Sequence, residues 1–321
     1  MSALVTGAAG FIGASVAARL LDRGESVVGV DSFDPYYDPG LKAERAAALE
    51  GRPGFRMVRA DVADAPGLLA LVKEVRPTLV AHMAAQAGVR YSLENPFAYE
   101  RANVAGHLSV LEACRATGVA HLVYASSSSV YGERAIDGPF SEDDPIAAPA
   151  SLYAATKRSG ELMSAAYSRL YGLAQTGLRF FTVYGPRGRP DMAYWRFTQA
   201  ILAGDPIEVF GEGRMARDFT YVDDIVDGVM GVVDRPAAPG EHRLFNIGDS
   251  RPVGLMSMIE LLERTLGREA VKVMRPMQPG DVGATWADVS RLNALCGYAP
   301  KVTLEEGLPR FVDWYRGRYG V

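Results

Sequence analysis

The stretch SALVTGAAGFIGASVAARLLDRG, residues 2–24, decides the fold of this chain. It opens with an apolar run typical of a buried strand, and apolar residues then recur at helical spacing as far as Gly24. Gly7, Gly10 and Gly13 stand between the two patterns. Glycines there permit a tight turn whose backbone N–H groups can approach a pyrophosphate, although an ordinary strand-to-helix turn is the alternative for three glycines by themselves.

Five more short β-rich runs follow, most of them separated by helical patterns. They are SVVGVD (26–31), FRMVRAD (55–61), TLVAHMA (78–84), HLVYAS (121–126) and QTGLRFF (175–181). This alternation predicts right-handed βαβ crossovers and therefore an α/β, Rossmann-type, doubly wound parallel sheet. After Phe181 the composition changes, with Pro, Gly and Arg clustered in VYGPRGRPDM (183–192). We therefore expect a nucleotide-binding domain over 1–181 and a smaller mixed α/β substrate lobe over 182–321, with segments near 215–247 packing back onto the first.

Composition narrows the possible functions. The 321 residues are 48% hydrophobic, enough for a substantial core, and no stretch reads as a signal peptide or a membrane span, so a cytoplasmic protein is expected. The net charge of −4 argues against a basic nucleic-acid-binding face. Two distant cysteines and four histidines without ligand spacing predict no metal site.

The end of the second predicted strand indicates which dinucleotide binds. Asp31 stands 18 residues after Gly13, where an acidic side chain can bind ribose hydroxyls, although a helix cap is an alternative role for it. Its charge would repel a 2′-phosphate, so the sequence predicts NAD rather than NADP. The residues expected to contact NAD are Gly7, Gly10, Phe11, Ile12, Gly13, Asp31, Ser32, Asp61, Val62, Ala84, Ala85, Gln86, Asn103, Tyr153, Lys157, Phe180 and Val183.

A tyrosine and a lysine suggest the chemistry. Tyr153 and Lys157 lie one turn apart on a predicted helix over 151–172. Two charges 4 Å apart at an effective dielectric constant of 20 interact by about 4 kcal/mol, so a lysine could lower the pKa of a tyrosine by at most roughly three pH units. Such a phenol can act as a base. An ordinary helix face is the alternative, but the serines at 126–129 end a strand just before this helix.

These features together resemble a known enzyme family. The glycine spacing, the SSSSVYG strand end (126–132) and the YxxxK pair are similar to those of the extended short-chain dehydrogenases/reductases that act on nucleotide sugars. The resemblance implies that Tyr153 is the catalytic acid/base, Ser127 hydrogen-bonds the reacting oxygen, and Lys157 binds the nicotinamide ribose. The 4,6-dehydratases of this family carry Asp and Glu after the catalytic Thr. Ser128 and Ser129 stand there instead, which disfavours dehydration.

Longer stretches resemble the 4-epimerases that act on UDP-glucuronate. They are DSFDPYYDPGLKAER (31–45), HMAAQAGVRYSLENPFAY (82–99), VYGPRGRPDMAYWRFTQAI (183–201), RDFTYVDDIVDG (217–228) and MQPGDV (277–282). The resemblance implies an isomerase that converts UDP-glucuronate to UDP-galacturonate through a 4-keto sugar. A UDP-galactose or UDP-N-acetylhexosamine epimerase, a UDP-glucuronate decarboxylase and a non-catalytic NAD-binding sensor remain as alternatives.

The same resemblance implies a set of substrate contacts. A C4 ketone two carbons from a C6 carboxylate forms a β-keto acid that readily loses carbon dioxide, so small hydroxyl donors are expected to hold the carboxylate. The residues expected to bind the substrate are Arg90, Ser126, Ser127, Ser128, Thr182, Arg189, Phe210, Arg217 and Asp281. Arg217 would bind the diphosphate and Asp281 the uridine ribose. Arg90 could instead be solvated, Phe210 could belong to the core, and the Ser129 hydroxyl could satisfy strand-end backbone.

Two residues depart from the epimerase pattern, and the resemblance also implies a second copy of the chain as a partner. Arg187 stands where the epimerase pattern usually has Trp, and Gly283 where it usually has Pro. The arginine would add charge near the substrate lobe. Related enzymes often dimerise through two helices each, so the resemblance implies a homodimer through segments 94–116 and 151–172.

Overall fold

The computed structural model describes residues 1–132, 138–146, 148–277 and 283–321. At its centre lies a parallel sheet of seven strands in the order β10-β6-β5-β4-β1-β2-β3. The strands are β1 (Ser2–Thr6), β2 (Ser26–Asp31), β3 (Phe55–Arg59), β4 (Leu79–His82), β5 (His121–Ser127), β6 (Gln175–Phe180) and β10 (His242–Ile247). The predicted doubly wound α/β fold is confirmed. The strand order reverses between β1 and β4, and in such folds ligands bind beyond the carboxyl ends of the strands at that point.

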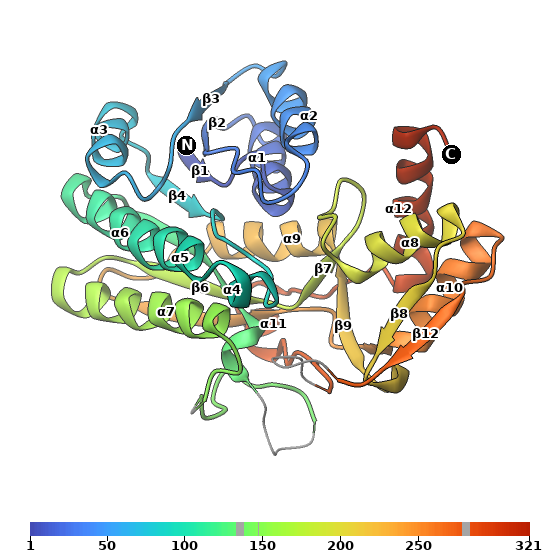
Figure 1. The fold of residues 1–321 in the computed structure, drawn as a ribbon. Helices are drawn as coiled ribbons and strands as arrows, with labels where there is room; N and C mark the ends of the chain where they lie inside the picture. Colours follow the sequence, from blue (N-terminus) through green and yellow to red (C-terminus); the bar gives the residue numbers. More distant parts are fainter. Residues whose placement is uncertain (133–137, 147, 278–282) are drawn as a thin grey trace.

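Helices cover both faces of this sheet (Figure 1). Alternate residues of β1 show the division: Ala3 and Val5 belong to one core with α1 (Phe11–Asp22) and α9 (Val222–Val233), and Leu4 belongs to another with α3 (Ala65–Val75) and α6 (Gly106–Thr117). Helices α2 (Pro39–Glu50) and α11 (Ser290–Cys296) pack beside α1 and α9, and α7 (Leu152–Tyr171) beside α6. Burial on both faces explains why the strands read as nearly continuous apolar runs.

Helix α7 has strong local signals at both ends. The Ser151 hydroxyl accepts a hydrogen bond from the Ala154 N–H at 3.1 Å and caps the first turn. Gly172 ends the helix in the left-handed conformation, with φ of 73°. The sequence therefore fixes this helix within narrow limits, and Tyr153 lies in its first turn.

The segment before α6 differs from the continuous helix that its sequence predicts. After the short helices α4 (Tyr91–Glu94) and α5 (Pro96–Tyr99), the chain forms a π-helical turn, η1 (Glu100–Ala105). Asn103 lies in this turn, and its side-chain amide bonds both the N–H and the carbonyl of Gln86 at 2.9 and 3.0 Å. Single π-turns inside helices are frequent near functional sites.

The second lobe lies on the right in Figure 1 and holds two small sheets. One consists of β7 (Thr182–Tyr184), β9 (Ala216–Tyr221) and β11 (Pro252–Gly254), and the other of β8 (Ile207–Phe210) and β12 (Lys272–Arg275). Helices α8 (Ala193–Ala203), α10 (Leu255–Leu266) and α12 (Leu304–Tyr319) pack on them, with a short 3₁₀ turn η3 (Gly211–Gly213). The chain crosses between the lobes more than once. After β7, β8 and β9 of the second lobe it returns to the central sheet, where β10 pairs with β6. The division at residue 181 stays a prediction.

The four histidines have hydroxyl partners inside the fold. His82 shares a hydrogen bond with Thr6, His107 with Ser164, His121 with Thr176 and His242 with Tyr124. Across the described ranges no group of three or more His, Cys, Asp or Glu is placed to hold a metal ion. None of the helices in the described part of the chain is long and apolar enough to cross a membrane.

Candidate active site

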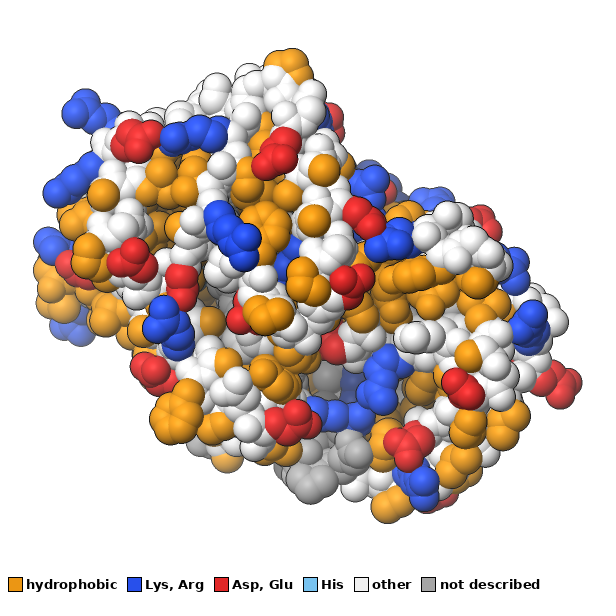
Figure 2. Space-filling model, turned by 45° about the horizontal axis from the view of Figure 1, so that its top comes forward, with side chains coloured by type: hydrophobic (Ala, Val, Ile, Leu, Met, Phe, Trp, Pro, Cys, Tyr) orange, Lys and Arg blue, Asp and Glu red, His pale blue; other side chains and the backbone are white. Residues whose placement is uncertain are grey.

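A cavity of about 1450 Å³ opens between the two lobes at the carboxyl ends of the central strands. Figure 2 shows Lys and Arg side chains gathered in a hollow of the molecular surface. Of the predicted site residues, Gly7, Gly10, Phe11, Ile12, Gly13, Asp31, Ser32, Asp61, Val62, Ala84, Ala85, Gln86, Arg90, Ser126, Ser127, Ser128, Tyr153, Lys157, Phe180, Thr182, Val183, Arg189, Phe210 and Arg217 line it. Asn103 does not line it, and Asp281 lies outside the described residues.

The glycine turn requires its glycines for close packing. Gly7 has φ of 69°, and the Gly10 N–H donates to the Gly7 carbonyl at 2.8 Å. A Cβ atom at Gly13 would lie 2.1 Å from that same carbonyl oxygen. Helix α1 begins at Phe11, and its N-cap residue Gly10 has no side chain to cap it, so the first N–H groups of the helix are available to an anion.

Asp31 joins the second strand to this turn. Its carboxylate is largely buried and accepts hydrogen bonds from the N–H groups of Ala9 at 3.0 Å and Phe33 at 2.8 Å. Asp61, at the end of the next strand, accepts from the Ala63 N–H at 2.8 Å and from the Arg101 guanidinium at 2.7 Å. Both carboxylates therefore have fixed orientations at the wall of the cavity.

Gln86 and Asn103, both predicted to contact NAD, have different positions: Gln86 lines the cavity and Asn103 does not. Asn103 lies behind the cavity wall, where its amide also donates to Thr156 of α7 at 3.1 Å. It thus holds Gln86 in place rather than facing the cavity. The Gln86 side-chain nitrogen is buried near the Tyr99 hydroxyl and makes no hydrogen bond of standard geometry with the described residues. A buried amide without a partner is costly, so this nitrogen is a candidate donor to a ligand.

The predicted catalytic residues converge at the end of β5. Tyr153 lies beside Ser127, and Lys157 donates to the Ala125 carbonyl at 2.8 Å. Burial raises the pKa of the Tyr153 phenol, against a hydrogen bond with Ser127 and the charge of Arg189, which lower it. Burial also lowers the pKa of the Lys157 ammonium to about 8. The expectation that Lys157 lowers the pKa of Tyr153 therefore needs correction, since desolvation dominates and the cation that acts on the phenol is Arg189.

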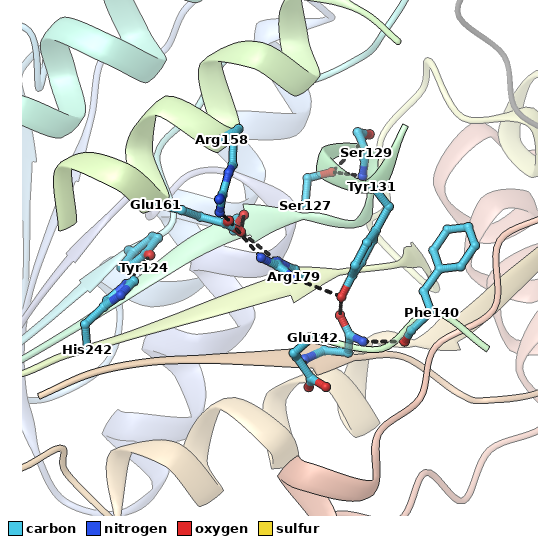
Figure 3. A network of polar contacts seen from close by, with 12 residues as sticks. Tyr124, Ser127, Ser129, Tyr131, Phe140, Glu142, Arg158, Glu161, Arg179 and His242 are labelled. Atoms are coloured by element: carbon cyan, nitrogen blue, oxygen red, sulfur yellow. Dashed lines mark hydrogen bonds and ion pairs between the residues drawn. The ribbon is translucent and has the colours of Figure 1, made fainter. Parts of the chain in front are cut away.

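The serines of the tract have two different sets of partners, and Figure 3 shows the contact between Ser127 and Ser129. Ser126 donates to the buried carboxylate of Glu161 at 2.6 Å, so its hydroxyl is already engaged inside the fold. Ser127 lies within hydrogen-bonding distance of Ser129 Oγ at 3.1 Å and accepts from the Ser129 N–H, which caps the 3₁₀ turn η2 (Ser128–Tyr131). Ser128 and Thr182 line the cavity and remain the hydroxyls best placed for a substrate.

Arg189 is paired more tightly than its sequence context indicates. It forms a two-pronged ion pair with Asp191, at 3.0 and 2.5 Å, and Tyr36 also donates to that carboxylate at 3.3 Å. Burial would raise the pKa of the Asp191 carboxyl, but Arg189 holds it below its usual range. Asp191 was missed, although it lies only two residues beyond Arg189 in the same motif.

The far end of the cavity brings together residues of both lobes. The guanidinium of Arg90, which precedes α4, lies 4.7 Å from the ring centre of Phe210 at the end of β8. Arg217 of β9 donates to the carbonyls of Ala216 at 2.8 Å and Gly283 at 3.3 Å. Arginine guanidinium groups here can bind the paired oxygens of a diphosphate.

A buried arginine, Arg45, binds the backbone of the loop that carries Arg187. The Arg45 guanidinium, from α2, donates to the carbonyls of Arg187, Gly188 and Ala9 at 2.6, 2.7 and 3.2 Å, and to the Tyr37 hydroxyl at 2.8 Å. It thereby ties the glycine turn to the loop before α8. The Arg187 side chain itself is exposed.

Gly283, the other departure from the epimerase pattern, lies where a larger side chain would also fit. A Cβ atom added at Gly283 would meet nothing within 4 Å, so that position does not require glycine for space. Its carbonyl accepts hydrogen bonds from Arg217 and from the Ala216 N–H, at 3.3 and 3.0 Å. Residue 283 therefore contributes to this part of the cleft through its backbone carbonyl.

Comparison with known proteins assigns the chain to a family. A model of the NAD dependent epimerase/dehydratase family matches residues 3–248, and the chain belongs to this family. A probable UDP-glucuronate 4-epimerase of Rhizobium meliloti is 47% identical over 99% of this chain and 98% of its own length. The prediction of an NAD-dependent nucleotide-sugar epimerase is confirmed.

Solved structures support the same relationship. The UDP-glucuronic acid 4-epimerase of Bacillus cereus, in complex with UDP-glucuronic acid and NAD, superimposes with a TM-score of 0.93, at 36% identity over 99% of this chain and all of that one. A UDP-glucose 4-epimerase of Thermotoga maritima with UDP-glucose has a TM-score of 0.90, at 31% identity over 99% of both chains. The glycine turn, the uncapped start of α1 and the unpartnered Gln86 amide fit a bound NAD.

Proposed function

We propose that this chain epimerises UDP-glucuronate at C4, giving UDP-galacturonate through a 4-keto intermediate. The observation that carries the proposal is the convergence of Tyr153, Ser127 and Lys157 on a cavity that also contains the dinucleotide turn. The full-length similarity to enzymes named for UDP-glucuronate supports this sugar over others.

The roles of the catalytic residues follow from their contacts. NAD, when bound, supplies the acceptor and donor of the C4 hydride. The Tyr153 oxygen takes the proton of the C4 hydroxyl and later returns it, and Ser127 hydrogen-bonds the C4 oxygen. The charge of Arg189 and the hydrogen bond from Ser127 favour the phenolate against its burial. Because the proton returns to the same substrate, no net proton exchange with solvent is needed.

The surroundings of Ser127 favour retention of the sugar carboxylate. A β-keto acid decarboxylates most readily when its carboxylate is free to rotate, and Ser128 and Thr182 offer neutral hydroxyl donors to hold it. The residues that follow Ser127 are serines rather than carboxylates, so groups for eliminating water are missing there. Epimerisation is therefore the outcome that these side chains support.

The remaining cavity residues are assigned to the nucleotide. Arg217 binds the diphosphate, and the Arg90–Phe210 pair lies at the uridine end. Asp31 and the glycine turn bind the adenosine half of NAD. Asp281 keeps its proposed role at the uridine ribose on sequence resemblance only.

One experiment tests the reaction. NAD-loaded protein is incubated with UDP-glucuronate and the UDP-sugars are separated by chromatography. UDP-galacturonate supports the proposal. UDP-xylose would show a decarboxylase, turnover of UDP-galactose or a UDP-N-acetylhexosamine in its place would show a neutral-sugar epimerase, and NAD binding without turnover of any UDP-sugar would show a sensor.

We also propose a cytoplasmic homodimer. Large apolar side chains are exposed on helices α5 and α7, which pack side by side, among them Phe97 at 80%, Leu162 at 57% and Leu170 at 67% exposed. A second copy of this face would bury them in a four-helix contact. Light scattering should give twice the chain mass, and Leu162→Glu should reduce it to one chain mass if the contact is correct.

A further inference from the structure

Helix α7 presents a third ionisable residue on its catalytic stripe. Tyr153, Lys157 and Glu161 follow one another at intervals of four residues, so all three lie on the face that packs against β5. The Glu161 side chain is 1% exposed. A carboxylate this deeply buried is costly unless every oxygen is satisfied.

Figure 3 shows how the Glu161 carboxylate is satisfied. One oxygen accepts from Ser126 Oγ at 2.6 Å and from Arg179 Nε at 2.8 Å. The other accepts from Arg179 Nη2 at 2.9 Å and from Arg158 Nη1 at 2.8 Å. Burial would raise the pKa of Glu161, but Arg179 and these hydrogen bonds hold it below its usual range, so the group is a carboxylate at neutral pH.

These contacts place Glu161 at the catalytic end of β5. Lys157 binds the carbonyl of Ala125, and Glu161 binds the side chain of Ser126, the two residues that directly precede Ser127. Two adjacent anchors therefore set the position of the strand end relative to the helix that carries Tyr153. The Arg179 partner sits on β6 in register with Ser126, which extends the anchor to the next strand.

The same network continues to the last strand of the sheet. Arg179 donates to the Tyr131 hydroxyl at 2.9 Å, and Tyr131 donates to the Asn246 side chain on β10 at 2.6 Å. Three neighbouring strands are thus connected through one carboxylate. Displacing Glu161 would loosen the end of β5 on which Ser127 lies.

The charges around Lys157 give Glu161 a second effect. The titratable and charged groups that face the ammonium are Tyr153 and Glu161 on α7, Tyr124 on β5, His82 on β4, His107 on α6 and Arg189 before α8. Burial lowers the pKa of His82 and lowers that of His107 to about 3, so both are neutral at pH 7. Burial and Arg189 disfavour the ammonium, and Glu161 is the negative group that favours it.

We propose that Glu161 is a positioning residue for catalysis, which keeps Lys157 cationic and fixes the strand end that carries Ser127. The proposal rests on the function proposed above, in which Tyr153, Ser127 and Lys157 converge on the cavity that holds the substrate. Ser126 accordingly belongs to this buried anchor rather than to the substrate contacts.

The test follows the titration of Lys157 in the NAD-loaded protein. The chain contains five lysines, Lys42, Lys73, Lys157, Lys272 and Lys301, so lysine labelled with ¹³C at Cε gives few NMR signals. We expect Glu161→Gln to lower the titration midpoint of Lys157 by about one pH unit, because an opposing charge is removed. The pH above which kcat stops rising should move in the same direction.

Two variants and an internal reference keep the result interpretable. Ser126→Ala removes a hydrogen bond to Glu161 without changing its charge, so the Lys157 midpoint should stay at the wild-type value. The Lys42 signal should not move in either variant, because Lys42 contacts Asp34 and Tyr37 instead. If Glu161→Gln fails to fold, Glu161→Gln with Arg179→Gln leaves no unpaired buried charge. Because this double variant also loses a cation, its Lys157 midpoint should fall by less than in the single variant, but should still lie below the wild-type value.

Two results would overturn the inference: an unchanged Lys157 midpoint in folded Glu161→Gln, or an equal shift in Ser126→Ala. The first would mean that Glu161 acts only in packing, and the second that geometry rather than charge sets the titration. The NMR readout needs no substrate. A protein that failed to turn over UDP-glucuronate would contradict the proposed function and still report on Glu161.

Discussion

Replacing Ser127 with alanine separates catalysis from folding at the end of β5. In the resting structure its hydroxyl caps the turn η2 through the Ser129 N–H at 3.1 Å and hydrogen-bonds Tyr153. Loss of a side-chain cap costs about 1 kcal/mol of stability. Loss of a hydrogen bond to an oxygen that gains negative charge in the transition state costs about 3–4 kcal/mol, or roughly 10²–10³ in kcat.

The pH profile should change as well. The hydrogen bond with Ser127 lowers the pKa of Tyr153, so its removal raises that pKa further. Because the phenolate is the reactive form, the acid limb of kcat should move to higher pH in Ser127→Ala. The assay is chromatographic conversion of UDP-glucuronate by NAD-loaded protein between pH 7 and 11, with thermal unfolding measured on the same samples.

Ser129→Ala is the matched control, since it removes a hydroxyl two residues away that contacts Ser127 but not Tyr153 in the structure. We expect it to lower kcat by less than about tenfold, as for loss of a neutral hydrogen bond. A folded, NAD-loaded Ser127→Ala protein with kcat within about threefold of wild type would refute the assignment, because a hydroxyl at the reacting oxygen cannot be so dispensable.

Three further predictions concern other parts of the cleft. Gly13→Ala should weaken NAD binding about tenfold or more, measured by calorimetry, because its Cβ atom would lie 2.1 Å from a backbone oxygen. Above about pH 8, kcat should stop rising with pH, because loss of the Lys157 proton offsets the growing fraction of Tyr153 phenolate. The unfolded chain holds that proton up to a pKa near 10.4, so the same titration should raise the free energy of unfolding between about pH 8 and 10.4, measured in urea. Arg45→Met should cost at least about 3 kcal/mol in urea denaturation by leaving three carbonyls without donors, whereas the exposed Arg187→Ala should change stability by less than about 0.5 kcal/mol.

The sequence predicted the central sheet well because its strands are buried on both faces. Burial of that kind leaves short apolar runs that alternate with helical patterns, and glycines at the helix ends mark the boundaries. The glycine turn and the Tyr153–Lys157 pair were predicted for a related reason, since their spacing within one element is local. The π-helical turn over residues 100–105 could not be predicted, because it depends on the contact between Asn103 and the distant backbone of Gln86.

Some of the site residues that were not predicted carry a recognisable spacing in the sequence, and others carry none. Glu161 stands four residues after Lys157 and Asp191 two residues after Arg189, so both could have been singled out from spacing. Arg45 could not, because its partners lie 36, 142 and 143 residues away along the chain. The direction of the Tyr153 pKa shift was also out of reach, since desolvation depends on what the whole fold places around the phenol.

The way the chain joins the lobes limits how the reaction can proceed. A single residue separates β6 from β7, no residue separates β9 from α9, and β10 returns to the central sheet from the second lobe. Several short covalent links of this kind resist a wide hinge opening. A cleft of about 1450 Å³ between walls that stay still leaves room for a bound sugar to swing. We therefore expect inversion at carbon 4 to proceed by rotation of the ligand inside the cleft, with little movement of the two lobes relative to each other.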